Sequence, residues 1–380
     1  MGRASAGSVG VDDPRDRGAR AAQESLRMDG AKHRHLGAAP AIAASLTLLV
    51  GACSGGERVL VGLSPLDGEV LAWAEGAFEE DHPGIDLRWR RVPGEEVAAE
   101  LVASDGEIGL VWGVPSWVLA GAAAGGLLSA LEASPEWAAA LPPELRDRED
   151  AWLATLTDPV VLAFNTDSLA RSRAPRDWLG VLHPMWSGSV AWPDAGATES
   201  GALIVGTRVA ADGARTGDPD AGFDWLARVD ANVDAYLAAD GDPARLIASG
   251  AMLVGVSLLS AVEAERRAGR PVDYRVPESP TPVLVRGAAV PAGTPDLAAA
   301  TTFVDWVGRP EQARALMDRF ALLPAAPGLA EEASPGSALA VAAAAVRFAA
   351  VDADTLAARL GAWVQRWRTE VQGRAPRVLR

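Results

Sequence analysis

Short apolar runs alternate with amphipathic segments along most of the chain. Val59–Leu63 and Ile108–Trp112 have the length and composition of buried strands, and Ile85–Val92 alternates apolar and polar positions. A helical pattern follows each of them, at about 68–80, 95–104 and 113–125. Strand–helix repeats of this length predict a parallel sheet covered by helices.

A second set of alternating elements begins with a long apolar stretch at Trp152–Asn165, which predicts a pair of strands. Further strands are expected at about 186–191, 234–238, 252–256, 272–276 and 283–290. Further helices are expected at about 199–212, 223–229, 243–249, 260–269, 297–307 and 310–320. The alanine-rich segment 325–345 is expected to be loose. An amphipathic helix at about 352–371 carries Leu356, Leu360, Trp363 and Trp367 on one stripe, which is typical of core contacts.

The apolar run Ala38–Val50 stands apart from this pattern. Its 13 residues are too few for an ordinary transmembrane helix but fit the apolar core of a secretory signal. Small residues then precede the lone cysteine, Cys53, and the stretch Leu49–Cys53 resembles a bacterial lipobox. The resemblance implies cleavage before Cys53, lipidation of its sulfur and anchoring to a membrane. We therefore expect a leader and lipoprotein signal peptide at 1–52 and a tether at 53–57, with Met28 as a second candidate start; the alternative for Cys53 is a buried cysteine.

Composition excludes several classes of function. The chain has 35 Lys and Arg against 50 Asp and Glu, a net charge of −15, and removal of residues 1–52 leaves 28 basic and 45 acidic residues, or −17. Such an acidic chain is not expected to bind nucleic acid. The single lysine, Lys32, excludes lysine-dependent phosphate loops and Schiff bases from the main body, and a single cysteine excludes an intrachain disulfide.

Enzyme motifs are also missing from the sequence. Trp192–Asp194 spells the acid loop of tyrosine phosphatases, but the cysteine–arginine loop of those enzymes is absent. No GxSxG, HExxH or strand-linked GxGxxG occurs. We expect neither a catalytic residue nor a cofactor.

A series of short motifs, in order along the chain, resembles the type II periplasmic solute-binding proteins of ABC importers. Within them it is most similar to the branch that binds ferric iron, thiamine, polyamines or phosphonates. The motifs are Ile108–Gly113, Leu141–Arg146, Pro159–Asn165, Trp192–Gly201, Ala244–Gly250, Val272–Pro277, Phe303–Trp306, Pro310–Gln312 and Leu322–Pro324. Their order, more than any one of them, carries the resemblance.

The resemblance implies an α/β fold of two Rossmann-like lobes with a ligand cleft between them. Two crossover strands, near 157–165 and 274–290, would join the lobes. The first lobe would comprise 58–158 plus 278–380, with the C-terminal helices, and the second 159–277. The implied protein is a monomer in the periplasm or at the cell surface, and its partners are a small-molecule solute and a membrane-embedded ABC permease.

Candidate solute contacts lie in the turns that follow the strands, because open α/β sheets bind ligands beyond the carboxyl ends of their strands. They are Ser64, Gly94, Trp112, Gly113, Thr198, Ser200, Gly201, Asp242 and Ser257. Residues 198–201 begin an expected helix, whose free N–H groups and hydroxyls suit an anion. Alternatives remain open: Thr198, Ser200 and Asp242 as helix caps, and Trp112 as a core residue. Glu199 either faces solvent or meets a cationic group of the ligand.

Iron is not the expected ligand. The iron-binding relatives carry a tyrosine pair where this chain has Ser257–Ser260, and only Tyr236 and Tyr274 occur anywhere. His82 and His183 each stand alone before a proline, so no metal site is expected. An organic anion, such as a phosphonate or phosphate ester, is the expected solute. The alternatives are a ferric-iron or a polyamine- or thiamine-binding homologue, and a tethered sensor or scaffold that has lost transport.

Overall fold

A computed structural model describes residues 58–349 and 351–374. The expected signal peptide, the tether and Cys53 lie outside the described residues. The described residues belong to one compact unit. Within this unit the strands and helices match most of the elements that the sequence predicts.

In the part of the chain that the structure describes, eleven strands make up the sheet, in the order β2-β1-β3-β10-β5-β8-β6-β7, with β4, β9 and β11 paired beside this path. The strands are β1 (Arg58–Ser64), β2 (Ile85–Arg91), β3 (Leu110–Pro115), β4 (Leu128–Ser129), β5 (Trp152–Asn165), β6 (Val190–Pro193), β7 (Val233–Leu237), β8 (Val254–Leu258), β9 (Val272–Arg275), β10 (Val283–Pro291) and β11 (Leu323–Pro324). Strands β1, β2 and β3 are parallel, as are β6, β7 and β8, and β10 runs antiparallel to β3 and β5.

Helices cover the sheet. They are α1 (Gly68–Asp81), α2 (Val97–Ala103), α3 (Ser116–Ala124), α4 (Trp178–Val181), α5 (Glu199–Thr216), α6 (Ala221–Asp230), α7 (Asp242–Ala248), α8 (Leu259–Arg267), α9 (Leu297–Val307), α10 (Pro310–Phe320), α11 (Leu329–Ala333), α12 (Ala338–Ala345) and α13 (Ala353–Arg366). A short turn of helix, η2 (Gly94–Glu96), precedes α2, and a π-helical turn, η7 (Trp367–Val371), extends α13.

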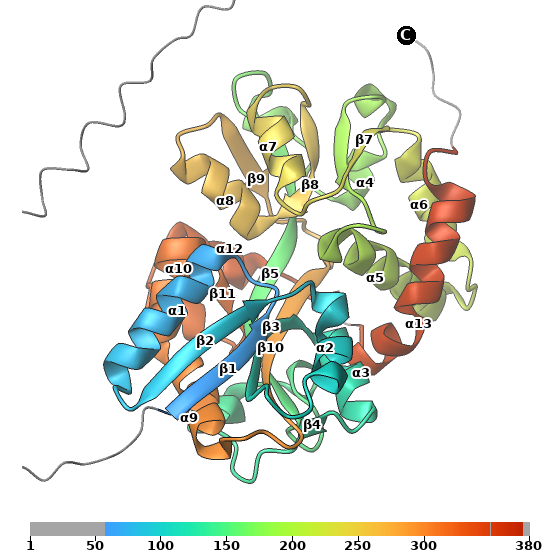
Figure 1. The fold of residues 1–380 in the computed structure, drawn as a ribbon. Helices are drawn as coiled ribbons and strands as arrows, with labels where there is room; N and C mark the ends of the chain where they lie inside the picture. The colour runs from blue at the N-terminus through green and yellow to red at the C-terminus, as the bar shows by residue number, and fades with distance from the viewer. Residues whose placement is uncertain (1–57, 350, 375–380) are drawn as a thin grey trace, which may run out of the picture. The chain divides into compact units, whose positions relative to one another are not determined.

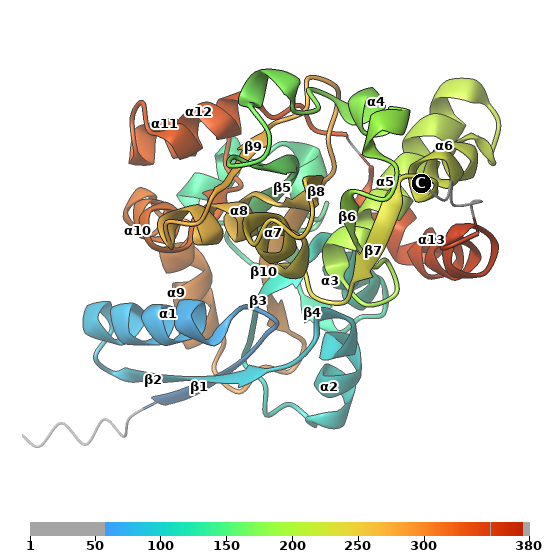
Figure 2. The ribbon, with the colours of Figure 1, turned by 90° about the horizontal axis from the view of Figure 1, so that it is seen from above.

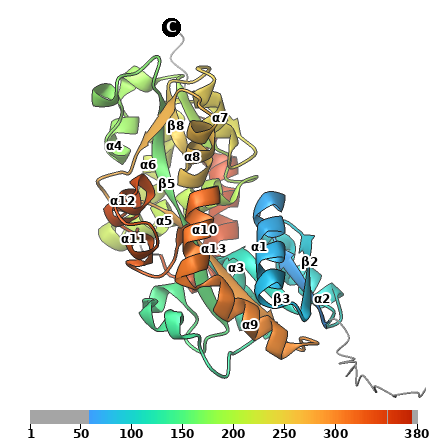
Figure 3. The same cartoon turned by 90° about the vertical axis from the view of Figure 1, so that its left-hand side faces the viewer.

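Strand β5 joins the two halves of the fold (Figures 1 and 3). Its residues up to Pro159 pair with β10, and from Val160 onward they pair with β8 and β9. We call the part built on β2, β1, β3 and β10 the first lobe, and the part built on β8, β6, β7 and β9 the second lobe. The expected pair of strands at 152–165 is thus one continuous strand of 14 residues, all of them buried.

The return connection near 274–290 contains the two strands that the sequence predicts at 272–276 and 283–290. It consists of β9 and β10, separated by residues 276–282, where prolines remove backbone donors from the ladder. The hydroxyl of Thr281 donates to the carbonyl of Val160 at 2.8 Å and ties this segment to β5. Both connections between the lobes therefore pass side by side.

An aromatic group anchors the first lobe. Phe303 makes ring contacts with Phe78, Trp89, Trp112 and Trp306, with centroids 5.2–5.6 Å apart. Edge-to-face and tilted pairs of this kind add to the free energy of burial. The tryptophans of this cluster therefore serve packing.

Helix α13 packs against both lobes. It lies beside α3 of the first lobe and α5 of the second (Figure 2). Leu356 and Leu360 belong to the hydrophobic cluster of the second lobe, together with Trp367 of η7. An added Cβ on Gly206 of α5 would lie 2.7 Å from Leu360, so the glycine permits the close approach of these helices. The expected assignment of residues 278–380 to the first lobe therefore covers the contact of α13 with α3 but not its contact with α5 of the second lobe.

The expectation of a loose segment at 325–345 is wrong. This stretch forms α11 and α12, and Leu329, Ala333, Leu339 and Ala342 are buried in the cluster of the first lobe. Its alanine-rich composition carries no clear amphipathic stripe. Small apolar residues can nonetheless pack closely against neighbouring helices, which a sequence pattern does not reveal.

Candidate functional site

A cavity of about 1250 Å³ lies between the two lobes. This is above the usual range for small-molecule sites, so the cavity has room for a solute and ordered water. Residues of the first lobe that line it include Gly94, Glu95, Pro115, Trp117 and Arg286. Residues of the second lobe that line it include Thr198, Glu199, Asp240, Asp242 and Ser260.

Arg286 is the most buried of the arginines that line the cavity. Its side chain is 11% exposed, and it is the only charge in the apolar strand β10. One guanidinium N–H donates to the carbonyl of Gly113 at 2.9 Å, and the other terminal nitrogen lies 2.5 Å from Glu199 Oε2. The remaining arginines of the wall are exposed: Arg91, Arg245, Arg267, Arg319 and Arg368.

Asp158 sits in the middle of β5, where the strand passes from one lobe to the other. It is 3% exposed and accepts hydrogen bonds from the backbone N–H and the hydroxyl of Ser260. Burial raises the pKa of Asp158 to about 6, although the bonds from Ser260 and the charge of Arg286 act in the opposite direction. The cavity thus contains a carboxyl group that titrates in the mildly acidic range.

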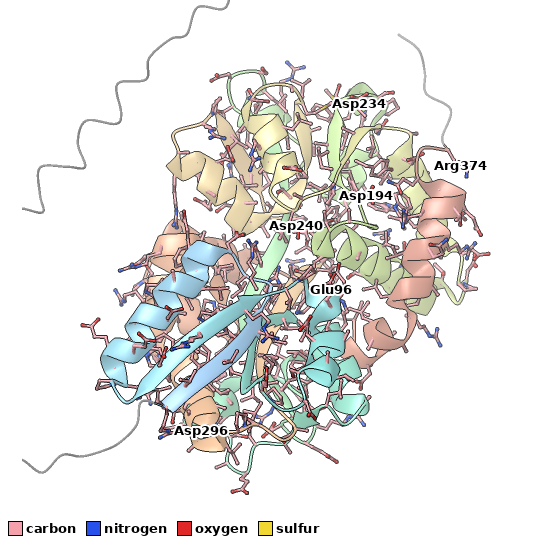
Figure 4. All side chains as sticks on the ribbon, in the orientation of Figure 1. Glu96, Asp194, Asp234, Asp240, Asp296 and Arg374 are labelled. Atoms are coloured by element: carbon pink, nitrogen blue, oxygen red, sulfur yellow. The ribbon has the colours of Figure 1, made fainter. Side chains whose placement is uncertain are left out.

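Asp240 lies in the loop between β7 and α7, and its carboxylate is placed at the N-terminus of α5 (Figure 4). Its carboxylate accepts the backbone N–H of Ser200 at 3.1 Å and also the hydroxyl of Ser200. The N–H of Gly201 goes to the hydroxyl oxygen of Thr198 at 3.0 Å. A carboxylate at a helix N-terminus is favoured by the exposed N–H groups and the helix dipole. The N–H groups of Ser200 and Gly201 and the hydroxyls of Thr198 and Ser200, on which the expectation of an anion depends, are therefore already paired.

Three of the candidate contacts line the cavity: Gly94, Thr198 and Asp242. Thr198 is also the N-cap of α5, so it fills the structural role that the alternative interpretation assigns to it. Asp242 is the first residue of α7, with its carboxylate 3.7 Å from Arg245. The N-cap of α7 is Gly241, so the interpretation of Asp242 as the N-cap is wrong by one residue.

Six candidates do not belong to the cavity wall: Ser64, Trp112, Gly113, Ser200, Gly201 and Ser257. The hydroxyl of Ser64 accepts the N–H of Leu66 at 3.2 Å, and Ser257 donates to the carbonyl of Asp240 at 3.4 Å. Both side chains are fully buried; the hydroxyl of Ser64 holds a turn together, and that of Ser257 ties β8 to the loop that carries Asp240. Trp112 is fully buried as well; its ring packs on Trp89, and its N–H donates to the hydroxyl of Thr155.

Two of these residues act through their backbone. Gly113 has φ +73°, and an added Cβ would lie 2.3 Å from Leu66, so glycine is required there and its carbonyl is free to hold Arg286. An added Cβ on Gly201 would lie 2.7 Å from the backbone of Asp194 and Ala195. Neither residue offers a side chain to a ligand, but both shape the elements around the cavity.

The sequence analysis missed Asp158, Asp240 and Arg286. Asp158 and Arg286 are isolated charges within apolar strands, and charged residues are rarely buried in a core without a partner or a function. That signal could have marked both. Asp240 gives a weaker signal, because an Asp-Gly-Asp-Pro turn is common before a helix.

Among the described residues, no cluster of three or more His, Cys, Asp or Glu side chains is arranged to hold a metal ion. Tyr236 and Tyr274 do not contribute to the cavity wall. In the part of the chain that the structure describes, no helix combines the length and apolar character that a membrane span requires.

The chain belongs to the family of bacterial extracellular solute-binding proteins, whose family model matches residues 74–345. A relative from Sinorhizobium fredii, the probable ABC transporter periplasmic-binding protein y4fP, is 28% identical over 316 residues, which is 81% of this chain and 85% of the relative. The protein is therefore the solute-binding component of an ABC importer, which implies a small-molecule ligand, a permease partner and a periplasmic location.

Solved structures agree on the fold. The periplasmic binding protein AfuA from Actinobacillus pleuropneumoniae, with fructose-6-phosphate bound, matches with a TM-score of 0.70 and 19% identity, covering 83% of this chain and 99% of AfuA. Iron-bound HitA from Pseudomonas aeruginosa matches with a TM-score of 0.69 and 20% identity, covering 81% and 98%. The expected type II periplasmic binding protein fold is confirmed. Since these two proteins bind different classes of ligand, their likeness leaves the solute of this chain open.

Proposed function

We propose that this protein is a lipid-anchored receptor that captures a small organic solute between its lobes and presents it to the permease of an importer. The observation that carries the proposal is the interlobe cavity of about 1250 Å³, lined from both lobes by polar and charged side chains. Closure of two lobes around a ligand is the general way in which such a site signals occupancy. The lipid anchor rests on the sequence around Cys53 alone.

The charges of the cavity support a solute with a positively charged nitrogen. Asp158, Glu199 and Asp240 contribute three carboxyl groups, whereas Arg286 is the single cation among the mostly buried charges of the wall as described. Closing the lobes over an uncompensated negative charge is costly, because a buried charge needs a partner. A cationic group of the solute would supply that partner. Trp117, which also lines the cavity, adds an aromatic surface suited to such a group.

An organic anion is the competing candidate, and Arg286 favours it. AfuA shows that this fold holds a sugar phosphate. The α5 N-terminus, however, already donates to Asp240 and Thr198. A phosphate group there would have to displace a carboxylate that is bound by two donors, and we therefore place the cationic solute first.

A thermal-shift screen of the chain from Ser54 onward tests the proposal. The panel contains polyamines, thiamine, phosphonates, sugar phosphates, inorganic phosphate and ferric iron. A ligand at a hundred times its dissociation constant stabilises the folded state by about 2.7 kcal/mol, a shift of a few degrees. We expect a polyamine or thiamine to give the shift, and Asp240→Asn to reduce it. Asp234→Asn is the matched control, because Asp234 is exposed on β7 and does not line the cavity.

Each other outcome contradicts a stated part of the proposal. A shift with anions alone would contradict the cationic solute but keep the receptor. A shift with ferric iron alone would show that the protein ligates metal without the tyrosine pair. No shift with any compound would favour the tethered sensor or scaffold.

A further inference from the structure

Glu199 and Arg286 form an ion pair that joins the two lobes. Glu199 lies in the first turn of α5 in the second lobe, and Arg286 lies on β10 in the first. Arg286 Nη2 and Glu199 Oε2 are 2.5 Å apart, and the side chains are 11% and 17% exposed. The guanidinium is held on its other side by the carbonyl of Gly113. Glu199 thus takes the place that a carboxylate or phosphate group of a solute would otherwise take on Arg286.

The first lobe is shaped to receive this carboxylate. An added Cβ on Gly94 would lie 2.4 Å from Glu199 Oε1 and 3.1 Å from Pro115 Cδ. A Cβ at Gly94 would require the end of the Glu199 side chain to shift away from its position, so the glycine leaves room for this carboxylate. The geometry at Gly94 and the ion pair are separate observations, and both place the same carboxylate against the first lobe.

We infer that Glu199 is a built-in anionic ligand of Arg286 and that it makes the cavity reject solutes that would bring a negative group to this arginine. The inference rests on the proposed function, because it concerns the same cavity. A competing anion would have to displace Glu199. The displaced carboxylate would remain near Asp240 and Glu95 without a counter-ion, and uncompensated charges of this kind are costly in a desolvated site.

The electrostatic surroundings of Glu199 agree with this role. Burial raises the pKa of Glu199, and Arg286 acts most strongly against that effect, whereas Asp240 and Glu95 add to it. Arg286 is therefore the group on which the charged form of Glu199 depends. Rejection of anions by an internal competitor is a specificity device that works through repulsion as much as attraction.

Titration with inorganic phosphate tests the inference without knowledge of the natural solute. The chain from Ser54 onward is compared with Glu199→Gln and with Glu95→Gln by isothermal calorimetry. Glu95 lines the same cavity, so its substitution removes one negative charge but leaves the ion pair intact. We expect Glu199→Gln to bind phosphate at least about tenfold more tightly than wild type, and Glu95→Gln to stay within about twofold. Adding Arg286→Met to Glu199→Gln should abolish the gain.

A second variant keeps every charge in place. Gly94→Ala pushes the Glu199 carboxylate away from the first lobe and should increase phosphate affinity in the same direction. Gly241→Ala is its control, since Gly241 lines the same cavity and an added Cβ there meets nothing within 4 Å. Equal phosphate binding by wild type, Glu199→Gln and Gly94→Ala, including no binding by any, would overturn the inference. So would an equal gain in Glu95→Gln, which would reflect net charge alone. Neither result depends on whether the screen above finds a solute.

Discussion

Asp158 makes the stability of this protein depend on pH in a direction opposite to that of most carboxyl groups. The group is buried in β5 and has a pKa raised from 3.8 to about 6 by desolvation. The folded state therefore holds a proton that the unfolded state has already lost between about pH 4 and pH 6. Stability associated with this group is fully present below the unfolded pKa and is lost as the pH rises through the folded pKa.

The size of the effect follows from the pKa shift. A change of about 2 units corresponds to roughly 3 kcal/mol, at 1.36 kcal/mol per unit. Replacement by asparagine removes the titration but keeps the shape of the side chain. The amide oxygen can accept the Ser260 N–H, which the carboxylate accepts at 3.1 Å, and the amide nitrogen can donate to the Ser260 hydroxyl. The stability difference between Asp158→Asn and wild type should therefore shift in favour of asparagine by about 2–3 kcal/mol between pH 4 and pH 7.5.

Urea unfolding of both proteins at several pH values measures this difference. Asp150→Asn serves as a control of opposite sign. Burial raises the pKa of Asp150, but hydrogen bonds from Arg146 and Ser134 outweigh it and lower the pKa below its usual value. Its contribution to stability is thus lost as the pH falls, and Asp150→Asn should cost more at pH 7 than at pH 3. A difference for Asp158→Asn that stays constant with pH, or that moves in favour of aspartate as the pH rises, would refute the reasoning.

Three packing predictions concern the cores and are checked by urea unfolding at neutral pH. Gly222→Ala should destabilise the protein by about 1–3 kcal/mol, because the new Cβ would lie 2.4 Å from the Cα of Val209 in α5, and backbone cannot move aside cheaply; a neutral effect would show that α5 and α6 separate easily. Gly361→Ala, where an added Cβ meets nothing within 4 Å of α13, should instead stabilise it by about 0.5–1 kcal/mol, and a loss would contradict the helix there. Phe303→Ala should lower the free energy of unfolding by about 3–5 kcal/mol, because Phe303 contacts four other aromatic rings and is fully buried. A loss below about 1 kcal/mol would mean that the aromatic cluster repacks.

Hydrophobic periodicity was sufficient to predict most of the strands and helices in their order. The apolar run at 108–112 became β3, and the alternating run at 85–92 became β2. A strand buried on both faces has a continuous apolar run, and a strand buried on one face alternates apolar and polar residues. The failures are at places where the pattern is silent. The alanines of 325–345 show no stripe, and a single strand of 14 apolar residues looks like two strands when strands are usually shorter.

The sequence by itself determined the class of the fold, the family and the turns in which Gly94, Thr198 and Asp242 meet the cavity. These features depend on local periodicity, on capping residues and on motifs in a fixed order. The tertiary structure alone decided which charges share the cavity. Asp158, Glu199, Asp240 and Arg286 are separated by tens of residues, and no spacing rule connects them. They meet because β5 crosses between the lobes beside β10, and because the start of α5 faces that crossing. The interaction of two charges depends on their distance in space, not on their separation in the sequence. The topology of the sheet sets that distance, and it therefore decides which charges form an ion pair between the lobes.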